Sequence, residues 1–260
     1  MAPHDFAQDY WIVIPAYNEA ATVRDVASRA RLQCTNVVVV DDGSTDGTAE
    51  VLAALDVTVL RNETNCGKAG SLVRGFDHAM AQGAVGVITL DADGQHAPEE
   101  IPLFLDQSAK HPTAFLIGAR RCEQRKTAVS RYVANRIADF WINWAAGLPI
   151  EDSQSGFRLY PASLLRTVSL RADKTRSFVF ESEILIEAAR RGINCRNVEI
   201  TVTPRSGPRP SHFRPLVDIL RITQMVAWKL LSRGLYLRGL WISLRSSEIQ
   251  YTVPSFTKGE

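Results

Sequence analysis

The sequence predicts an α/β fold in which a mostly parallel sheet is flanked by helices. Short runs of β-branched residues alternate with longer stretches of helical periodicity along the first half of the 260-residue chain. These runs are almost continuously apolar, which is typical of parallel strands buried between two layers of helices. A chain of this length suits one such domain with a short C-terminal extension.

The elements of the first half are expected in a repeating strand and helix order. Strands are expected at residues 11–15, 37–40, 57–60, 85–90 and 114–118, and helices at 19–33, 48–55, 68–82 and 98–110. Pro98 marks the start of the last of these helices, because proline suits a first helical turn and Glu99 and Glu100 oppose the positive end of the helix dipole. The DADGQH segment before it is therefore a loop at the end of a strand, where open α/β sheets bind ligands.

Beyond residue 120 this rhythm changes. An aromatic helix is expected at about 128–146, a loop at 151–158, a helix at about 181–191 and a final strand at 198–204. Residues 203–215 are rich in proline and arginine and lead into an apolar and basic stretch that reaches about Arg245. The second half is expected to build a different side of the molecule from the first.

The composition excludes some partners. The net charge of +2 is the difference between 30 basic and 28 acidic side chains, so attraction of the whole molecule to nucleic acid is not expected. The four cysteines are widely spaced, which indicates a reducing cytoplasm: Cys34, Cys66, Cys122 and Cys195. Because no run approaches roughly 18 consecutive apolar residues, any contact with a membrane is expected at its surface.

Three oxygen-bearing side chains, Asp91, Asp93 and Gln95, stand at alternate positions directly after an apolar strand. Alternate residues of an extended segment point the same way. The three would then present hard oxygen ligands to Mg²⁺ or Mn²⁺, and the metal would neutralise charge on a departing diphosphate. The pattern is short, and a solvated acidic turn explains it at least as well.

Two other loops place polar groups at the end of an apolar strand. The loop DDGSTDGT at 41–48 offers Asp42, whose carboxylate could accept hydrogen bonds from a base or a ribose. A helix-capping loop without a ligand explains the same residues equally well. The first strand ends in an aromatic and polar group, which suits a nucleoside pocket or an ordinary turn: Pro15, Tyr17, Asn18 and Glu19.

Together with residues 65–79, these three segments stand in the order and approximate spacing seen in family-2 glycosyltransferases. The chain resembles that family over roughly residues 10–205, and most closely its dolichol-phosphate mannosyltransferase-like branch, whose members use polyprenyl phosphates as acceptors. The resemblance implies a GT-A fold, in which a Rossmann-like nucleotide-binding half joins an acceptor half. It also implies transfer with inversion at the anomeric carbon of the sugar.

The resemblance further implies roles for single residues. The residues expected to bind the nucleotide sugar are Pro15, Tyr17, Glu19, Asp42, Lys68 and Asp91. The expected metal ligands are Asp91, Asp93 and Gln95, because the DADxQ motif supplies them in that branch. Three residues are expected nearest the chemistry: Arg120 in GARR and Arg205 after the final strand as phosphate-binding cations, and Asp152 in DSQSGFR beside the reacting centre.

Glu181 and Glu183 stand at the start of a predicted helix, where capping explains them at least as well as catalysis.

The expected organisation is a GT-A domain at 8–205, a basic loop with amphipathic helices at 206–250 and a tail at 251–260. Within the domain, 8–120 would bind the nucleotide sugar and 121–205 the acceptor. The expected activity is metal-dependent transfer of a hexose from a GDP- or UDP-sugar to a polyprenyl phosphate or similar lipid at the cytoplasmic membrane face. Which of the two nucleotides is used cannot be read from the sequence, nor can the oligomeric state.

The acceptor is open to alternatives. A hydroxyl of a glycan or glycolipid would need a general base, for which Asp152 is the candidate, whereas a lipid phosphate is already anionic. Aromatic and basic residues at helical spacing in 132–144 and 216–244 favour a lipid, although packing in a core or a dimer explains them too. A different class of function is a non-catalytic nucleotide-sugar-binding partner of another enzyme.

Overall fold

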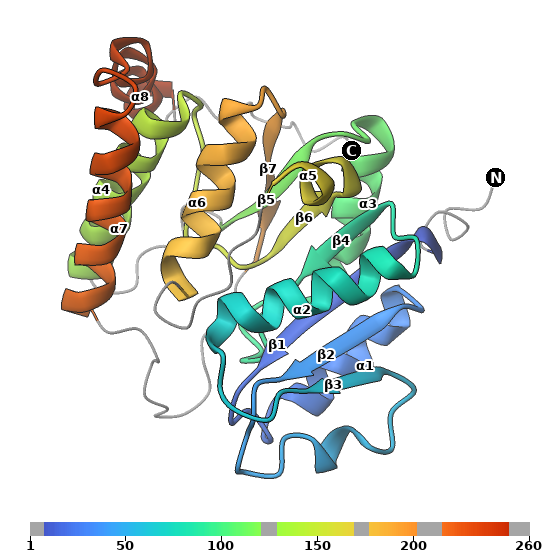
Figure 1. Cartoon of the computed structure of the whole chain (residues 1–260). Coiled ribbons are helices and arrows are strands. Elements are labelled where there is room, and N and C mark those ends of the chain that lie inside the picture. The colour runs from blue at the N-terminus through green and yellow to red at the C-terminus, as the bar shows by residue number, and fades with distance from the viewer. Residues whose placement is uncertain (1–7, 121–128, 169–176, 202–214, 250–260) are drawn as a thin grey trace, which may run out of the picture.

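The computed structural model describes residues 8–120, 129–168, 177–201 and 215–249, and its elements follow an α/β order (Figure 1). The strands are β1 (Tyr10–Ala16), β2 (Val37–Asp41), β3 (Thr58–Arg61), β4 (Gly86–Thr89), β5 (Phe115–Arg120), β6 (Arg158–Pro161) and β7 (Cys195–Ile200). The α-helices are α1 (Val23–Gln33), α2 (Gly67–Ala81), α3 (Ile101–Lys110), α4 (Val129–Ala146), α5 (Ala162–Thr167), α6 (Ser177–Arg190), α7 (Pro215–Leu231) and α8 (Leu237–Ile249). Two short 3₁₀ helices are η2 (Glu50–Leu52) and η3 (Pro98–Glu100).

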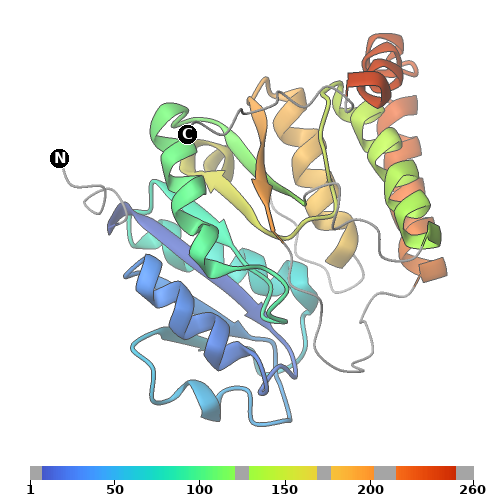
Figure 2. The same ribbon diagram turned by 180° about the vertical axis from the view of Figure 1, so that it is seen from behind.

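Within these residues the strands form a single sheet of seven, in the order β3-β2-β1-β4-β6-β5-β7. Successive side chains of each strand point to opposite faces of the sheet, so its apolar side chains form two cores, one on each face. Val13, with Val38 of β2, packs toward α2 on one face, while Ile12 and Ile14 pack toward α1 and α3 on the other. Figures 1 and 2 show α2 in front of the sheet and α1 and α3 behind it. The predicted α/β class with a mostly parallel sheet is confirmed.

One strand was not predicted. β6 lies between β4 and β5 and runs antiparallel to both, pairing Arg158 with Thr89 and with Ile117. Its four residues, RLYP, are too few to give a periodic signal, and an arginine is unusual in a buried strand. Because β6 runs against its neighbours, the loop that precedes Arg158 lies at the carboxyl ends of the parallel strands. This brings residues 151–157 to the ligand-binding edge of the sheet.

Several predicted boundaries shift. α1 begins at Val23 rather than at Glu19, because residues 19–22 form a turn. In this turn the carbonyl oxygen of Glu19 accepts hydrogen bonds from the backbone amides of Thr22 and Val23. The helix expected at 48–55 is only η2, and α6 begins at Ser177 rather than at 181.

The last strand was expected at 198–204 but is Cys195–Ile200, an edge strand paired with β5. Its exposed polar residues Arg196 and Asn197 hid its start from the apolar pattern.

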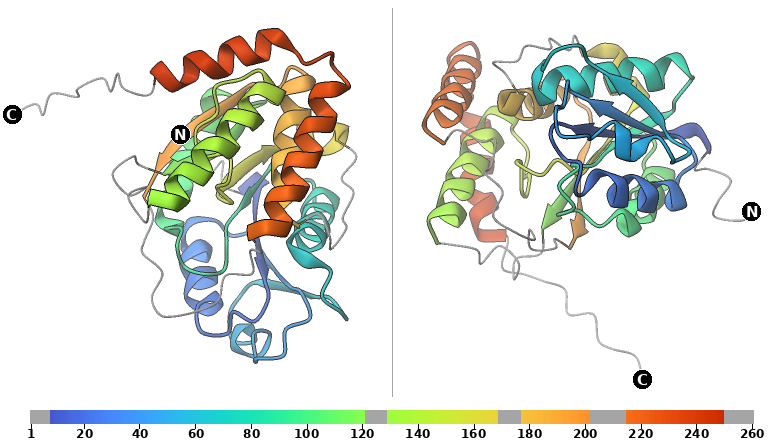
Figure 3. Two further views of the ribbon diagram at one scale, coloured as in Figure 1. Left: turned by 90° about the vertical axis from the view of Figure 1, so that its left-hand side faces the viewer. Right: turned by 90° about the horizontal axis from the view of Figure 1, so that it is seen from below.

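The C-terminal helices form the predicted helical extension. α8 crosses α4, and α7 packs against α4 and α6, so α4, α7 and α8 make an outer layer beside the sheet domain (Figure 3). Trp144 of α4 donates its indole N–H to the carbonyl oxygen of Leu235 at 2.9 Å, and Ser243 of α8 donates its hydroxyl to the carbonyl oxygen of Phe140 at 2.8 Å. Gly239 lets the two helices approach, since a Cβ there would lie 2.3 Å from the carbonyl oxygen of Trp144.

We predict that Gly239→Ala lowers the free energy of unfolding by about 1–3 kcal/mol, the usual cost of overpacking. The obstacle is a backbone oxygen, which cannot rotate away as a side chain could. Urea unfolding followed by tryptophan fluorescence measures the change. Alanine favours a helix more than glycine does, so Gly239→Ala should raise the stability if α8 were not packed closely on α4. A higher stability of this variant would therefore contradict the close packing.

Candidate functional site

The candidate site lies where the loops after β1, β2 and β4 meet the loop before β6. The first two loops hold each other through short polar contacts. The Asn18 amide donates to Ser44 Oγ at 2.9 Å, and Asn18 Oδ1 accepts from the Thr45 amide at 2.9 Å. Asn18 has a left-handed backbone, with φ of 55°, which asparagine tolerates better than most residues. The contacts fix the loop in which the sequence predicted a nucleoside pocket.

The three residues predicted to line that pocket occupy different surroundings. Pro15 pairs with Val40 inside the sheet, and Tyr17 is half-buried in the loop. Glu19 is buried, and its carboxylate accepts a hydrogen bond from Thr22 Oγ1 at 3.0 Å at the start of the turn before α1. Its amide donates to Thr48 Oγ1 at 2.9 Å, which adds a further link between the two loops.

Asp42 is buried at the end of β2, and its carboxylate accepts three hydrogen bonds. The donors are the Asn62 side-chain amide at 2.7 Å and the backbone amides of Cys66 at 2.8 Å and Gly67 at 2.7 Å. A carboxylate at the N-terminus of α2 is stabilised by the exposed amides and the helix dipole. Asp42 therefore caps α2 rather than the helix directly after the DDGSTDGT loop, and a contact of Asp42 with a nucleotide stays a prediction.

The DADGQ segment does not form the extended stretch on which the metal prediction rested. Residues 92 and 93 form a turn, and Gly94 has a φ of 76°, in the left-handed region that favours glycine. The Gln95 amide donates to Asp93 Oδ1 at 3.0 Å, closing the turn. Asp91, Asp93 and Gln95 are all partly exposed on this turn. The turn brings the three residues together, and the alternation of an extended strand does not.

Asp91 belongs to a charged group that crosses the sheet edge. Lys68 of α2 lies 2.6 Å from Asp91 Oδ1 and 3.2 Å from Glu181 Oε1 of α6. Burial alone would raise the pKa of Asp91, but the Lys68 ammonium outweighs it and lowers that pKa to about 2. Burial would likewise lower the pKa of Lys68, yet Asp91 and Glu181 raise it above its ordinary value. Asp91 and Lys68 therefore stay ionised throughout the physiological range.

Gly156 keeps this group compact. A Cβ on Gly156 would lie 2.6 Å from Asp91 Oδ2 and 2.9 Å from Lys68 Nζ, so no larger residue fits without displacing the ion pair. Thr89 Oγ1 donates to the carbonyl oxygen of Gly156 at 2.7 Å and holds it in place. The loop before β6 is therefore pressed directly onto the acidic turn after β4.

Arg158 shapes that loop, and sequence reasoning missed it. Its side chain is fully buried and donates to three backbone carbonyl oxygens, those of Ser153, Ser155 and Glu181, each at 2.7 Å. A buried guanidinium needs several acceptors, and the fork of an arginine suits a loop folded around it. The signal in the sequence was an arginine directly before the apolar pair Leu159 and Tyr160.

Asp152 and Arg120 form the other predicted pair at this edge. Both nitrogens Nε and Nη2 of Arg120 donate to the Asp152 carboxylate, as does the Arg120 amide at 3.2 Å. Asp152 is 2% exposed and has a φ of 53°, a strained conformation of the kind found at functional sites. The hydrogen bond to Asp152 raises the pKa of Arg120, whose side chain is still 29% exposed. The pair thus presents a fixed cation rather than a free base.

Two side chains of α4 also bind the loop before β6. Asp139 Oδ1 accepts hydrogen bonds from the amide and the hydroxyl of Ser153 at 2.9 and 2.7 Å. Asn143 exchanges two hydrogen bonds with the backbone of Ile150, at 3.0 and 3.1 Å. The loop that carries Asp152 is thereby held from three sides: β5 binds Asp152 itself, α4 binds Ile150 and Ser153, and Arg158 of β6 binds Ser153 and Ser155.

The fit of these residues to a divalent metal ion is partial. Two carboxylates and an amide on one turn are the hard oxygen donors that Mg²⁺ and Mn²⁺ prefer. The buried His96 Nδ1 has no hydrogen-bond partner among the residues that the structure describes, and it lies 3.9 Å from Asp91 Oδ2. Within the described ranges, however, no three histidine, cysteine, aspartate or glutamate side chains are grouped as a metal site. A metal would therefore need oxygens from the donor or from Gln95.

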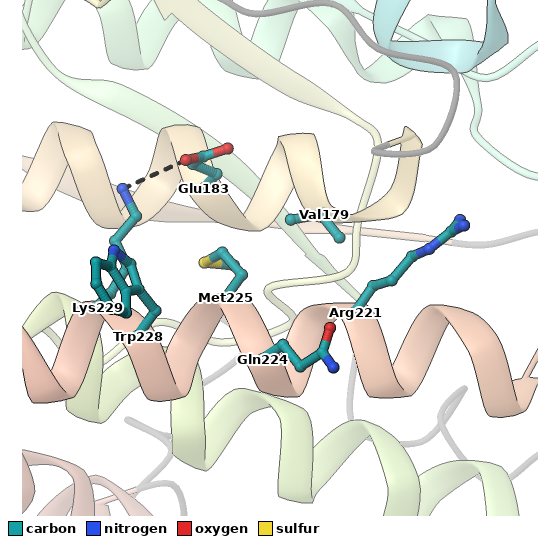
Figure 4. Close-up of a pocket in the computed structure, with 7 residues that line it drawn as sticks. All are labelled: Val179, Glu183, Arg221, Gln224, Met225, Trp228 and Lys229. Atoms are coloured by element: carbon teal, nitrogen blue, oxygen red, sulfur yellow. Dashed lines mark ion pairs between the residues drawn. The ribbon is translucent and has the colours of Figure 1, made fainter.

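Arg205, which was predicted as a phosphate-binding cation, lies outside the described residues. A hollow of about 340 Å³ lies between α6 and α7, lined by Glu183, Arg221, Met225, Trp228 and other residues (Figure 4). Glu183 faces Lys229 there at 3.4 Å, on the other side of α6 from Lys68 and Glu181.

Comparison with known proteins identifies the family of this chain. A family model described as glycosyl transferase family 2 matches residues 11–171. Polyprenol monophosphomannose synthase of Mycolicibacterium smegmatis is 30% identical over 205 residues, which are 75% of this chain and 77% of that protein. Undecaprenyl-phosphate mannosyltransferase of Micrococcus luteus is 32% identical over 203 residues, 74% of this chain and 83% of that one.

A solved structure with a similar fold is glucosyl-3-phosphoglycerate synthase of Mycobacterium tuberculosis, in complex with Mn²⁺, uridine diphosphate and phosphoglyceric acid. Its TM-score is 0.61 at 21% identity, and the match covers 89% of this chain and 81% of that one.

We predict that Arg158→Met lowers the free energy of unfolding by about 3 kcal/mol or more, because three buried carbonyl groups lose their donors at about 1–3 kcal/mol each. Arg196→Met is the matched control, since Arg196 lies exposed on the edge strand β7 and should change stability by about 0.5 kcal/mol or less. Urea unfolding of both proteins measures the difference. Equal stabilities would contradict the role given to Arg158.

Proposed function

The chain belongs to glycosyl transferase family 2, and we propose that it is an inverting enzyme that moves a hexose from a GDP- or UDP-sugar to a polyprenyl phosphate. The two relatives described above are both named for transfer to a polyprenyl phosphate, and each match spans about three quarters of this chain. The observation that carries the proposal for the acceptor is the pair of Arg120 and Asp152 at the edge of the sheet.

Arg120 is proposed to bind the acceptor phosphate. Asp152 orients its guanidinium, its side chain is 29% exposed, and a guanidinium is well suited to bind phosphate oxygens. A phosphate acceptor is anionic at neutral pH and gives up no proton when it attacks the sugar. An aspartate that holds an arginine is therefore sufficient here, and Asp152 acts as a positioning residue. Arg205 is proposed as a second cation for the phosphates.

The donor is proposed to bind along the loops after β1 and β2. Tyr17 and Pro15 would contact the nucleoside, while Glu19 and Asp42 would shape this wall through the hydrogen bonds they accept. Lys68 is proposed to lie beside the diphosphate, because its ammonium already stands at the carboxylate of Asp91. Each of these roles extends the family resemblance to single residues.

A divalent metal ion, Mg²⁺ or Mn²⁺, is proposed to be held by Asp91, Asp93 and Gln95. When bound, it would neutralise charge on the departing nucleotide diphosphate. The similar solved structure is a complex of that protein with both Mn²⁺ and uridine diphosphate, which supports this choice of cofactor. The chain's own contribution is a rigid acidic turn, closed by the Asp93 hydrogen bond and backed by Gly156.

The reaction is proposed to occur at the cytoplasmic face of the membrane, where a polyprenyl phosphate would be anchored. The division of the chain is proposed as a transferase domain at 8–205, with a donor half at 8–120 and an acceptor half at 121–205, then helices at 206–250 and a tail at 251–260. Asp42 and the loops after β1 and β2 fall in the first half and Asp152 falls in the second, while Arg120, the last residue of the first half, reaches across the boundary to Asp152.

A hydroxyl acceptor is the second candidate. The similar solved structure is named for a phosphoglycerate acceptor and not for a lipid phosphate, so the fold alone is compatible with other acceptors. In that case Asp152 would have to accept a proton, and its pairing with Arg120 would have to loosen first.

We predict that purified protein releases nucleotide diphosphate from a GDP- or UDP-sugar only when a short polyprenyl phosphate is added with Mn²⁺ or Mg²⁺. A chelator should abolish release, and fresh metal should restore it. Asp93→Ala should lower turnover about 100-fold or more, because it removes a proposed metal ligand. Asp106→Ala, an exposed carboxylate on α3, is the matched control and should change little. Lipid-independent release would favour the hydroxyl acceptor instead.

A further prediction separates the two acceptors. Asparagine tolerates the left-handed backbone of Asp152 and can still accept a hydrogen bond from Arg120, so Asp152→Asn should fold. With a phosphate acceptor its kcat should fall less than about 100-fold. With a hydroxyl acceptor the substitution would remove the general base, and kcat should fall by about 10²–10⁴-fold while the affinity for the donor is retained. Steady-state kinetics on both substrates distinguish these outcomes.

A further inference from the structure

The outer layer of α4, α7 and α8 carries most of the exposed apolar side chains of the described chain. Of eleven large hydrophobic residues that are exposed, eight lie on these helices or in the α7–α8 connection. They are Ile137, Trp141, Trp228, Leu231, Leu235, Leu237, Trp241 and Leu244, and we call them the outer face. The other three, Leu32, Val85 and Leu103, lie apart on α1, before β4 and on α3.

The outer face is not part of the core. On α7, Met225, Val226 and Leu230 are buried, whereas Leu231 is 65% exposed and Trp228, which also lines the hollow between α6 and α7, is 73% exposed. On α8, Gly239 and Ser243 face α4, whereas Trp241 is 56% exposed. The helices are thus docked through one side, and their second apolar side is left uncovered. Figure 3 (left) shows the three helices together in this layer.

Basic groups accompany these apolar residues. Residues 221–245 contain five arginines and lysines and no acidic residue, although the whole chain carries a net charge of only +2. Arg238 and Arg245 are exposed, and the Arg245 guanidinium lies 4.1 Å from the ring centroid of Trp241. Arg233 lies at the same distance over the ring of Tyr236. Exposed arginines therefore accompany the exposed aromatic side chains of this layer, while Lys229 is paired with Glu183 and Glu187 of α6.

We propose that the outer face rests on an anionic membrane surface. Exposed tryptophan and leucine side chains beside arginines suit the boundary between headgroups and acyl chains, where the apolar groups insert and the cations meet lipid phosphates. A second copy of the chain is a poorer occupant, because two basic faces would repel each other. No helix among the described residues is long and apolar enough to cross a membrane.

This proposal deepens the proposed function, on which its biological meaning rests, because it brings the site to the surface that holds a lipid acceptor. Membrane binding itself needs neither donor nor acceptor and can be measured without turnover. Two separate experiments therefore decide the two proposals. A protein that binds vesicles without transferring sugar would contradict only the proposed function.

The experiment is flotation of the full chain with phosphatidylcholine vesicles, with and without phosphatidylglycerol. The wild type should float with the anionic vesicles, more weakly at high salt, and its tryptophan emission should shift to the blue. Trp228→Ser combined with Trp241→Ser should weaken partitioning about tenfold or more, and so should Arg238→Gln combined with Arg245→Gln. The controls are Leu32→Ser with Leu103→Ser, and Arg24→Gln with Lys110→Gln, exposed residues on α1 and α3.

The outer-face variants keep every residue of the candidate site, so nucleotide diphosphate release with a short, water-dispersed acceptor should stay near that of the wild type. Equal flotation of the wild type, the outer-face variants and the controls would overturn the proposal. The proposal would also be overturned if the wild type did not bind vesicles and formed a dimer that the double variant Trp228→Ser, Trp241→Ser did not form. The outer face would then join two copies of the chain.

Discussion

The buried guanidinium of Arg158 is the interaction on which the rest of the site depends. It binds the carbonyl oxygens of Ser153 and Ser155 in the loop before β6, and that of Glu181 in α6. A charge buried this deeply is stable only while all its acceptors are in place, so the loop and the helix cannot move apart without a large cost. The antiparallel strand β6 supplies this anchor in the middle of an otherwise parallel sheet.

The loop held by Arg158 fixes the position of the pair Asp91 and Lys68 relative to the pair Asp152 and Arg120. The fixed loop presses Gly156 against Asp91 and Lys68, which belong to the acidic turn and to α2. The same loop carries Asp152 to Arg120 at the end of β5. The cation proposed for the acceptor and the acidic turn proposed for the donor's metal therefore share one rigid support. A transferase needs such fixed spacing, because its two substrates must meet in one orientation.

The sequence predicted the fold class and the loops of the site because apolar strands and the polar residues that follow them are local signals. It did not predict β6, whose partners are far away in the chain, or the role of Arg158, which depends on backbone carbonyls rather than on side-chain patterns. The sequence singled out Asp91 and Lys68, but not the cluster in which Lys68 joins Asp91 to Glu181, because its members come from three distant segments. The argument from alternation failed in the acidic turn, because Gly94 bends the backbone there.

The proposed reaction attaches the sugar to a phosphate, in inverted configuration. Phosphorus NMR of the lipid product, formed by purified protein from a nucleotide sugar and a short polyprenyl phosphate, is the decisive test. We expect the acceptor signal to change from a phosphomonoester to a phosphodiester, and the anomeric configuration to be opposite to that of the donor. A phosphomonoester that persists while sugar is transferred to a hydroxyl, or retention of configuration, would contradict it.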